Sequence, residues 1–589
     1  MAYHIDQANG DIVIDGFEQG IADAPEQGIS FMRNINLITV PGEAAVNFKT
    51  SAISAPPTSA VTGVSCTFAT TNSIVDFGAS TYLYTGLCVT FGSTSGGVTA
   101  GTLYWVSNVS GTTGKVYTDI GHSQLVAVTT SSNTYSIVSL GKLTHKALDL
   151  VNNYVFMLDS NGRAWWINAI GNLTFIGNVT LTGAQGNGLC VVGDFLYVFR
   201  DAAVDYIPIT YMTSTSAPAW TYGWQVITAP TPSSNPSHFA LATQDNGMYF
   251  CNNQFVASVL ATSGNNIDPS SATTYTFNAS ALRLPSVDRA TCLAELGTSL
   301  LVGGIQNKVY PWDRVSTSYT YPLVLSENLT TRMVTTNSST YIFAGNRGRI
   351  YITNGSNINL FKKIPDHTVQ IFSAANGTDP YFTWKDAMYW KNQIYFSFEA
   401  AKNDGTVITN MGGIWALDVS MNIMGTATAV GLRMVNTLSG GAATVPSVIA
   451  PNIRTATPGG AGIYAGWYNT LSTSYGVDIT TTGPYATGDN IGGEIYTDLI
   501  PTGTFIAPRT FSQVEFKLAK QMVSGESVRI SVRQSNSDSW TLLGTTTTAV
   551  LVDKYSMAVQ NGQWIQLYVE LFSTASSPSF VPLKELRIR

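Results

Sequence analysis

Residues 340–352 read TYIFAGNRGRIYI, and this short stretch carries the pattern that decides the fold. Two runs of β-branched and aromatic residues, which favour strands, flank a turn bounded by Gly345 and Gly348. The pattern predicts an antiparallel hairpin whose glycines form the turn and whose aromatic side chains pack against a neighbouring sheet. Such a hairpin is half of a small four-stranded sheet.

Related strand–turn–strand units recur along the middle of the chain at intervals of about 40–60 residues, which matches one blade of a β-propeller. A single blade is too thin to bury its own faces, and stacking blades around an axis covers them. We therefore expect a propeller of about seven blades, with six as the alternative, over residues 141–485. Separate β-sandwich domains, which repeat at about 80–100 residues, are the competing interpretation. The units begin near residues 147, 188, 239, 291, 340, 387 and 447, and the last has the weakest pattern.

Three further regions flank this repeat, and each one is predicted to be built from strands. Residues 1–54 hold short strand-like runs broken by Gly and Pro, and we expect them to contribute to a platform. Residues 55–140 are almost free of charge and alternate like strands, which predicts an inserted small β-barrel or sandwich. Residues 486–589 contain alternating runs such as Val528–Arg533, which predict a C-terminal, jelly-roll-like or related β-sandwich. The predicted fold class is all-β throughout.

Composition narrows the classes of function. Of 589 residues, 44% are hydrophobic and only 11% are charged, against a usual charged fraction of about 25%. Low charge favours burial in an assembly. A net charge of −6 argues against a protein that grips nucleic acid by its phosphates, although DNA could slide past a weakly acidic surface. We also expect neither a signal peptide nor a membrane span, since no apolar run approaches about 20 residues.

The sulfur- and nitrogen-bearing residues do not form a metal-binding pattern. The five cysteines are far apart, odd in number and without a CxxC pair, which predicts buried free thiols in a protein assembled in a reducing cytosol. They are Cys66, Cys88, Cys190, Cys251 and Cys292. The five histidines lie at no metal-ligand spacing, so we interpret them as surface or supporting polar groups. They are His4, His122, His145, His238 and His367.

The sequence lacks the common catalytic and ligand-binding motifs. HExxH, GxSxG, GxxxxGK[ST] and the EF-hand loop are absent. The run Asp159-Ser160-Asn161-Gly162 lacks the later ligands of a calcium loop and is interpreted as a β-turn. We therefore predict no catalytic, metal-binding or cofactor-binding residues, no cofactor, and a protein that is not an enzyme; any binding residues remain unknown.

The sequence leaves two alternative functions open, a glycosidase and a glycan-binding protein. A propeller glycosidase would use paired carboxylates, for which the candidates are Asp313, Glu327, Asp386 and Glu399, although their spacing does not mark a pair. A glycan-binding protein would stack sugars on aromatic rings. The candidate rings are Trp165, Trp166, Trp384 and Trp390, and alternating aromatics within strands are more often core residues.

Several short runs carry a resemblance to a family. The opening Gly16–Pro25, then Arg33-Asn34 and Pro41-Gly42, looks like the start of many phage tail proteins. Gly96-Gly97, Gly101-Thr102, Tyr104 and Val106 resemble a small β-domain common in phage structural proteins. Asn307–Arg314 and Ile350–Gly355 look like segments of phage propeller proteins. The whole plan is similar to the tail nozzle or tail-hub proteins of short-tailed phages.

The resemblance implies a structural role in a virion tail. In that family a β-propeller joins a β-sandwich platform built from the chain termini, and copies form a ring, often a hexamer, around the DNA exit channel. It implies other tail proteins as partners, such as tube, adaptor or fibre proteins, and viral DNA that passes without sequence-specific binding. It carries over no catalytic or binding residue. A minor tail protein of a long-tailed phage, a receptor-binding tail protein and a propeller glycosidase remain the alternatives.

Overall fold

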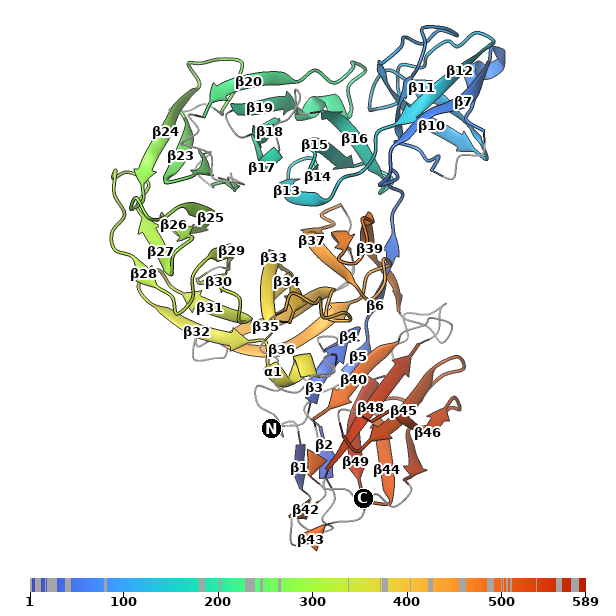
Figure 1. The fold of residues 1–589 in the computed structure, drawn as a ribbon, viewed down its shortest axis with the longest axis vertical. Helices are drawn as coiled ribbons and strands as arrows, with labels where there is room; N and C mark the ends of the chain where they lie inside the picture. Colours follow the sequence, from blue (N-terminus) through green and yellow to red (C-terminus); the bar gives the residue numbers. More distant parts are fainter. Residues whose placement is uncertain are drawn as a thin grey trace.

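The computed structural model of the protein shows a ring of small sheets, a barrel beside the ring and a sandwich below it (Figure 1). The residues that the structure describes are 3–5, 12–15, 17, 29–37, 44–78, 82–178, 186–200, 203–227, 239–243, 247–262, 266–336, 338–370, 372, 380–402, 404–421, 427–454, 462–484, 492–498, 500–501, 503–504, 507–508, 511–535, 538–557, 564–573 and 582–589.

The ring is a seven-bladed β-propeller, which confirms the predicted fold class. Every blade is a four-stranded antiparallel unit whose first strand lies innermost. The innermost strands of consecutive blades contact one another, and those of the first and seventh blades also meet, so the ring is closed. Stacking in a circle covers both faces of each thin sheet, which is why the repeat is stable.

The first five blades are contiguous in the chain. The first blade contains β13 (Leu143–Asp149), β14 (Tyr154–Asp159), β15 (Arg163–Ile167) and β16 (Leu173–Asn178), and the second contains β17 (Gly186–Val192), β18 (Phe195–Arg200), β19 (Ala203–Pro208) and β20 (Thr221–Val226). The third blade contains β21 (Ala240–Ala242), β22 (Gly247–Asn252), β23 (Phe255–Ala261) and β24 (Tyr275–Arg283), and the fourth contains β25 (Ala290–Leu296), β26 (Ser299–Gly304), β27 (Lys308–Trp312) and β28 (Leu323–Val324). The fifth blade contains β29 (Thr330–Thr335), β30 (Thr340–Ala344), β31 (Arg349–Thr353) and β32 (Ile358–Lys363).

The hairpin predicted at residues 340–352 lies in the fifth blade. Strands β30 and β31 pair in antiparallel register with Tyr341 opposite Ile352. Gly345 and Gly348 both adopt positive φ angles, +68° and +67°, which glycine tolerates without strain. A Cβ atom at Gly345 would also collide with the side chain of Glu327, so the turn requires glycine there for two reasons.

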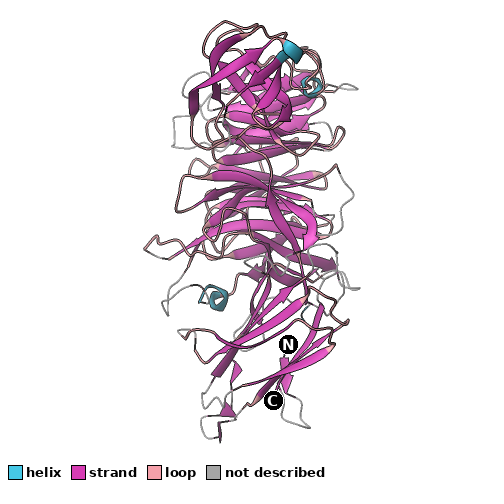
Figure 2. Cartoon of the chain, turned by 90° about the vertical axis from the view of Figure 1, so that its right-hand side faces the viewer, coloured by secondary structure: helices cyan, strands magenta, loops and turns pink. Residues whose placement is uncertain are grey.

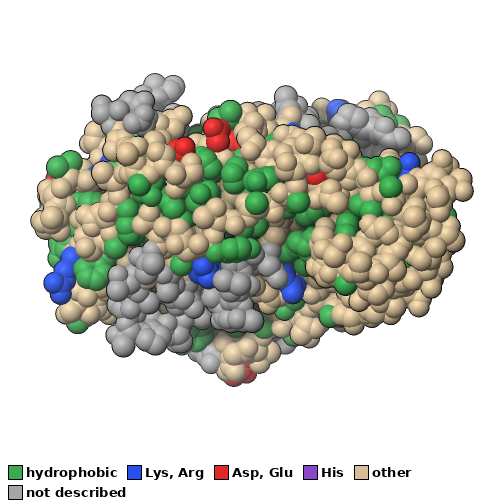
Figure 3. Space-filling model, turned by 90° about the horizontal axis from the view of Figure 1, so that it is seen from above, with side chains coloured by type: hydrophobic (Ala, Val, Ile, Leu, Met, Phe, Trp, Pro, Cys, Tyr) green, Lys and Arg blue, Asp and Glu red, His purple; other side chains and the backbone are tan. Residues whose placement is uncertain are grey.

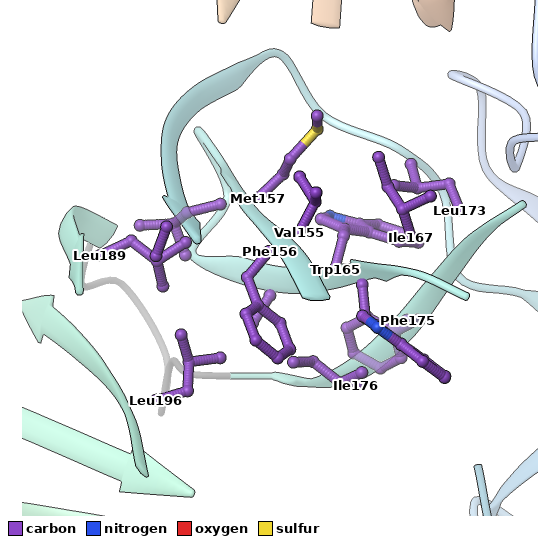
Figure 4. Close-up of a cluster of buried hydrophobic side chains, with 14 of the residues drawn as sticks. Val155, Phe156, Met157, Trp165, Ile167, Leu173, Phe175, Ile176, Leu189 and Leu196 are labelled. Carbon is purple, nitrogen blue, oxygen red and sulfur yellow. The ribbon is translucent and has the colours of Figure 1, made fainter. Parts of the chain in front are cut away.

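Apolar side chains between consecutive blades form the propeller core. Figure 4 shows this packing for the first blade, where Phe156, Trp165 and Phe175 lie together with Leu189 and Leu196 of the second blade. All five side chains are buried. The alternating aromatic residues of the sequence therefore fill blade interfaces, where each ring removes a large apolar area from water.

The sixth and seventh blades depart from the simple repeat. The sixth contains β33 (Tyr381–Trp390), β34 (Gln393–Ala401), β35 (Ile414–Met421) and β36 (Ala427–Asn436). The seventh contains β37 (Thr444–Pro451), β38 (Ile463–Asn469) and β39 (Tyr475–Pro484), and its outer strand is β6 (Phe48–Ala52) from the beginning of the chain. Residues 48–52, expected in the platform, thus belong to the propeller, because β6 pairs with β39 and adds the fourth strand to a blade for which the later part of the chain supplies three.

A single sheet runs from the sixth blade into the sandwich. Strand β36 pairs in parallel with β3 (Ile29–Arg33), which pairs in turn with β40 (Gly493–Thr497). The sheet continues through β48 (Trp564–Phe572) and β45 (Ser527–Arg533) to β46 (Thr541–Thr546), and β41 (Ile500–Pro501) pairs with β48. Figure 2 shows the sandwich strands continuing below the propeller. Strand pairing therefore continues from the propeller into the sandwich.

Buried charges reinforce the junction between propeller and sandwich. Arg33 Nε donates to Glu494 Oε2 at 2.6 Å, and Tyr568 Oη donates to Glu494 Oε1 at 2.7 Å. Arg433 Nε donates to the carbonyl oxygen of Ile35 at 3.0 Å. Burial raises the pKa of Glu494, and Arg33 opposes that shift. Since Arg33, Glu494 and Arg433 are all buried, the pairing geometry at this junction is strongly constrained.

The second sheet of the sandwich is built from both ends of the chain, and its apolar face packs on the first. It contains β1 (Tyr3–Ile5), β2 (Ile12–Ile14), β49 (Pro582–Ile588), β44 (Gln513–Leu518), β47 (Val552–Ser556), β5 (Ala44–Val46) and β4 (Ile35–Asn36). Ile14, Phe516 and Leu586 face Ile495 and Val569 of the longer sheet in one core. Shorter elements are β42 (Gly503–Thr504), β43 (Ala507–Pro508), α1 (Asp366–Gln370) and 3₁₀ turns at Thr71–Ser73 and Ile209–Met212.

The inserted domain is a closed six-stranded barrel that docks on the first blade. Its strands are β7 (Val61–Ala69), β8 (Ile74–Asp76), β9 (Cys88–Phe91), β10 (Leu103–Ser110), β11 (Thr113–Tyr117) and β12 (Ser131–Ile137). Trp105 Nε1 donates to the carbonyl oxygen of Phe175 at 2.8 Å, and Tyr84 Oη donates to that of Leu173 at 2.7 Å. These bonds reach β16, the outer strand of the blade.

The Tyr84→Phe variant tests how firmly the barrel is held. Removing the hydroxyl leaves the carbonyl of Leu173 without that buried donor, so the free energy of unfolding should fall by about 1–2 kcal/mol. Tyr381→Phe is the control, because Tyr381 is 45% exposed. Thermal unfolding of both variants measures the difference, and equal melting temperatures would show that the contact contributes nothing.

All five cysteines are buried and free of disulfides, as the sequence predicts. Burial raises the pKa of Cys66 to about 11 and the pKa values of Cys190 and Cys292 to about 12. Thiolate is the reactive form, so Ellman's reagent at pH 8 should label none of the five in the folded chain and all five in urea. Rapid labelling of the folded chain would contradict this expectation.

Candidate functional site: the propeller axis and the outer surfaces

Charged side chains from different blades meet at the axis of the propeller. Lys146 Nζ on β13 lies 2.7 Å from Asp386 Oδ2 on β33, and Arg332 Nε on β29 lies 3.5 Å from Asp386 Oδ1. The backbone N–H groups of Ile449 and Ala387 donate to the same carboxylate at 2.8 and 2.9 Å. Lys146 Nζ also donates to the carbonyl of Ile449. This network ties the first, fifth, sixth and seventh blades together.

The same network closes the axis. The Arg332 guanidinium lies 5.5 Å from the ring centroid of Phe239, which precedes β21 of the third blade, so the contacts reach across the ring. One cavity beside these contacts has a volume of about 90 Å³ and is lined by residues of the first, second, third, fifth and sixth blades. Among the described residues, the side chains that meet on the axis leave no passage for a nucleic-acid duplex, whose major groove alone is about 12 Å wide.

A second charged cluster joins the first, sixth and seventh blades. Lys385 Nζ lies 2.9 Å from Glu399 Oε2, and Tyr468 Oη donates to the same oxygen at 2.6 Å. Lys142 Nζ lies 3.6 Å from the centroid of the Tyr468 ring, a cation–π contact. Burial acts to raise the pKa of Glu399, but Tyr468 and Lys385 outweigh it, so the pKa is lowered. Glu399 therefore serves as a charged bridge between blades.

The structure assigns each of the four candidate glycosidase carboxylates to different partners. Asp386 and Glu399 belong to the two clusters above. Glu327 Oε2 accepts the backbone N–H groups of Asn346 and Arg347 at 3.0 and 3.1 Å. Asp313 accepts the backbone N–H groups of Val315 and Ser316 at 2.9 and 2.7 Å. Each of these carboxylates accepts hydrogen bonds that stabilise a turn or a blade interface, as buried or turn carboxylates commonly do.

Three of the four candidate sugar-stacking rings, Trp165, Trp166 and Trp384, are buried in the blades. Trp390 is half-buried and packs against the core between the sixth and seventh blades. A ring needs an exposed face to stack on a sugar, so the three buried positions offer no platform. Burial of these rings depends on the neighbouring blades. The local sequence pattern therefore could not distinguish core residues from exposed rings that stack on sugars.

The histidines fall into separate places. His122 lies in a barrel turn, where burial lowers its pKa, His145 lines the axial cavity, and His367 Nε2 lies 3.8 Å from Asp498 Oδ1. His4 lies in β1, and His238 lies outside the described residues. Within the described part of the chain, no three His, Cys, Asp or Glu side chains are grouped to hold a metal ion.

The open side of the sandwich exposes an apolar strand edge. Among the described residues, β46 pairs only with β45 and β47 pairs only with β44, so each ends its sheet. Leu542, Leu551 and Val552 at these edges are 55%, 45% and 45% exposed. We call these three residues and the two strands the sandwich edge. Unpaired backbone groups beside exposed aliphatic side chains are a ready docking site for another chain.

One face of the molecule is visibly poor in charge. Figure 3 shows few charged side chains among many uncharged polar and hydrophobic ones on the face seen from above. Figure 1 shows the barrel and the β46 edge projecting toward the same side of the molecule. In the described residues, no helix has the length and apolar character needed to cross a membrane.

Comparisons with known proteins show similarity of fold only. No protein-family model and no curated protein matches the chain. The chain is similar to the β-propeller domain of Cps50 (Swd1) from Myceliophteria thermophila, with 10% identity and a TM-score of 0.38 over 58% of this chain and 98% of that one. It is similar to the WD40 repeats of RRP9, with 8% identity and a TM-score of 0.40 over 58% and 95%. It is also similar to BamB from Moraxella catarrhalis, with 12% identity and a TM-score of 0.31 over 56% and 93%. These similarities concern the propeller fold alone.

Proposed function

We propose that this protein is a structural, non-enzymatic component of a bacteriophage tail, a nozzle- or hub-like subunit of the virion. Copies would form a ring, a hexamer being the order that the family resemblance suggests, and the ring would surround the DNA ejection conduit. Other tail proteins, such as tube, adaptor and fibre proteins, would dock on its outer faces. The subunit would be assembled in the host cytoplasm before it enters the virion.

The observation that carries this proposal is the continuous ten-stranded sheet from β33 to β46. It holds the propeller and the sandwich in one orientation, which a subunit that positions neighbours must do. The barrel, hydrogen-bonded to the first blade, adds a third rigid body. The chain thus offers fixed outer surfaces to other proteins, and the sequence resemblance supplies the expectation of a tail.

The closed axis supports a conduit between copies of the chain. Since Lys146, Arg332 and Asp386 span the centre of the propeller, DNA would pass between copies and not through a single ring of blades. A net charge of −6 reduces adhesion of phosphates to the protein, which suits a conduit wall that DNA must leave quickly.

Electron microscopy of the purified full-length chain tests the proposal most directly. Closed rings with a central opening, together with a matching mass by sedimentation, are the expected result. The same preparation should retain no double-stranded DNA at physiological salt. A monomer at tens of micromolar that binds host polysaccharide on a glycan array would replace the proposal with a receptor-binding role. Release of reducing ends from that polysaccharide would replace it with a glycosidase.

A further inference from the structure

The axial cavity contains more positive than negative charge. Lys146 and Arg332 line it, and among the described residues Asp386 is the carboxylate paired with both of them. The other ionisable groups on the seven innermost strands include Asp149, which accepts the backbone N–H of Val151 in its own turn. Glu295 is paired with Arg314, and Lys385 with Glu399.

Asp386 has no capacity left to balance the second cation. Its Oδ1 accepts the N–H of Ala387 and faces Arg332 Nε, while its Oδ2 accepts Lys146 Nζ and the N–H of Ile449. A carboxylate offers about four lone-pair positions, so all are used. One net positive charge therefore remains beside a cavity in the interior of the ring.

Arg332 still presents hydrogen-bond donors. A guanidinium group carries five N–H bonds; its Nη1 donates to the carbonyl of Thr331 at 3.0 Å and its Nε faces Asp386. Among the described residues no other acceptor is bonded to this group. The Phe239 ring holds the plane of the guanidinium from one side. Such a fixed fork matches two oxygens of a planar or tetrahedral oxyanion.

We propose that this cavity binds one small tetrahedral oxyanion, of which inorganic phosphate is the representative. The anion would accept hydrogen bonds from the Arg332 fork, with Lys146 and the His145 ring lining the same space. It would neutralise the excess charge and act as a structural tie between the first and fifth blades. This inference does not depend on the proposed tail function.

Size and access agree with such a ligand. A cavity of about 90 Å³ holds several times the space of one water, about 10–15 Å³ on the same kind of measure. The side chains of Lys146 and Arg332 are 19% and 17% exposed, so a small ion can reach them from solvent. Burial lowers the pKa of Lys146 and Arg332 adds to that effect, and a bound anion would counteract both.

Equilibrium dialysis of the full chain against radiolabelled phosphate, at pH 7 and constant ionic strength, measures the binding. We expect one phosphate per chain, competition by sulfate, and a melting temperature that rises with phosphate concentration as ligand linkage requires. Arg332→Gln should weaken binding by about tenfold or more, the loss expected for one charge-assisted contact. Arg347→Gln is the matched control, since Arg347 is an exposed arginine in a turn of the same blade.

Two outcomes would overturn the inference. One is the absence of saturable binding by the wild-type chain up to about 10 mM phosphate, which is weaker than the millimolar end of ordinary binding affinities. The other is equal binding by wild type and Arg332→Gln when circular dichroism shows that both are folded. Should Arg332→Gln fail to fold, Arg332→Lys keeps a cation but loses the fork, and it should bind measurably more weakly than wild type.

Discussion

The Asp386→Asn variant should lose about 3–5 kcal/mol of its free energy of unfolding, the usual consequence of removing one partner from a buried charge pair. The substitution preserves the size of the side chain but leaves Lys146 and Arg332 without their common carboxylate. It also weakens the acceptor for the backbone N–H of Ile449, which links the seventh blade to the sixth. The ring should therefore open at its axis at a much lower urea concentration.

Urea unfolding followed by tryptophan fluorescence, in buffer without phosphate or sulfate, measures this loss. The control is Asp366→Asn, which removes an exposed ion pair with Lys363 in which the Asp366 side chain is 59% exposed. An exposed pair contributes about 0–1 kcal/mol, so the control should unfold almost as the wild type does. An Asp386→Asn midpoint equal to that of the control would refute the structural role of the axial network.

The second large effect is expected at the sandwich edge. If copies of the chain dock through β46 and β47, the double variant Leu542→Asp/Val552→Asp should assemble about a hundredfold more weakly or not at all, since each new carboxylate would be buried without a partner. Both side chains are exposed in the single chain, so folding should be preserved. Sedimentation would then show monomers where the wild type forms rings.

Val315→Asp is the matched control for assembly. Val315 is 89% exposed in a turn of the fourth blade, and Figure 1 places that blade on the side of the propeller away from the β46 edge. This control should leave rings intact. If the edge variant still forms rings of wild-type mass, the sandwich edge is not the contact between copies, and the ring proposal would need another surface.

Alternating apolar and polar residues and turn glycines predict strands and hairpins, because these elements depend mainly on residues that are close in the sequence. The hairpin at 340–352 needs its own glycines and alternating apolar side chains, and the structure places it as β30 and β31. The same reasoning indicated two or three strands in each of the other blades, whereas the structure has four. The seventh blade had the weakest pattern because its fourth strand, β6, lies more than 400 residues before the strand that it pairs with, β39.

The periodicity of the sequence could not predict the charged network at the propeller axis. Asp386 stood among four possible acids, and nothing near it in the chain pointed to Lys146, which is 240 residues away. Closure of the ring brings the two together, as it also buries Trp165 and Trp384 inside blades. The parallel pairing of β36 with β3 likewise joins propeller to sandwich without any local signal.

From the residue pattern alone it follows that the chain is all-β and that its middle repeats at blade length. The distant strand that completes the seventh blade, the charges that meet on the axis and the edges that remain open are apparent only in the folded chain. The physical reason is that strand formation follows from alternation within a few residues, whereas pairing between distant edges depends on the closed ring as a whole.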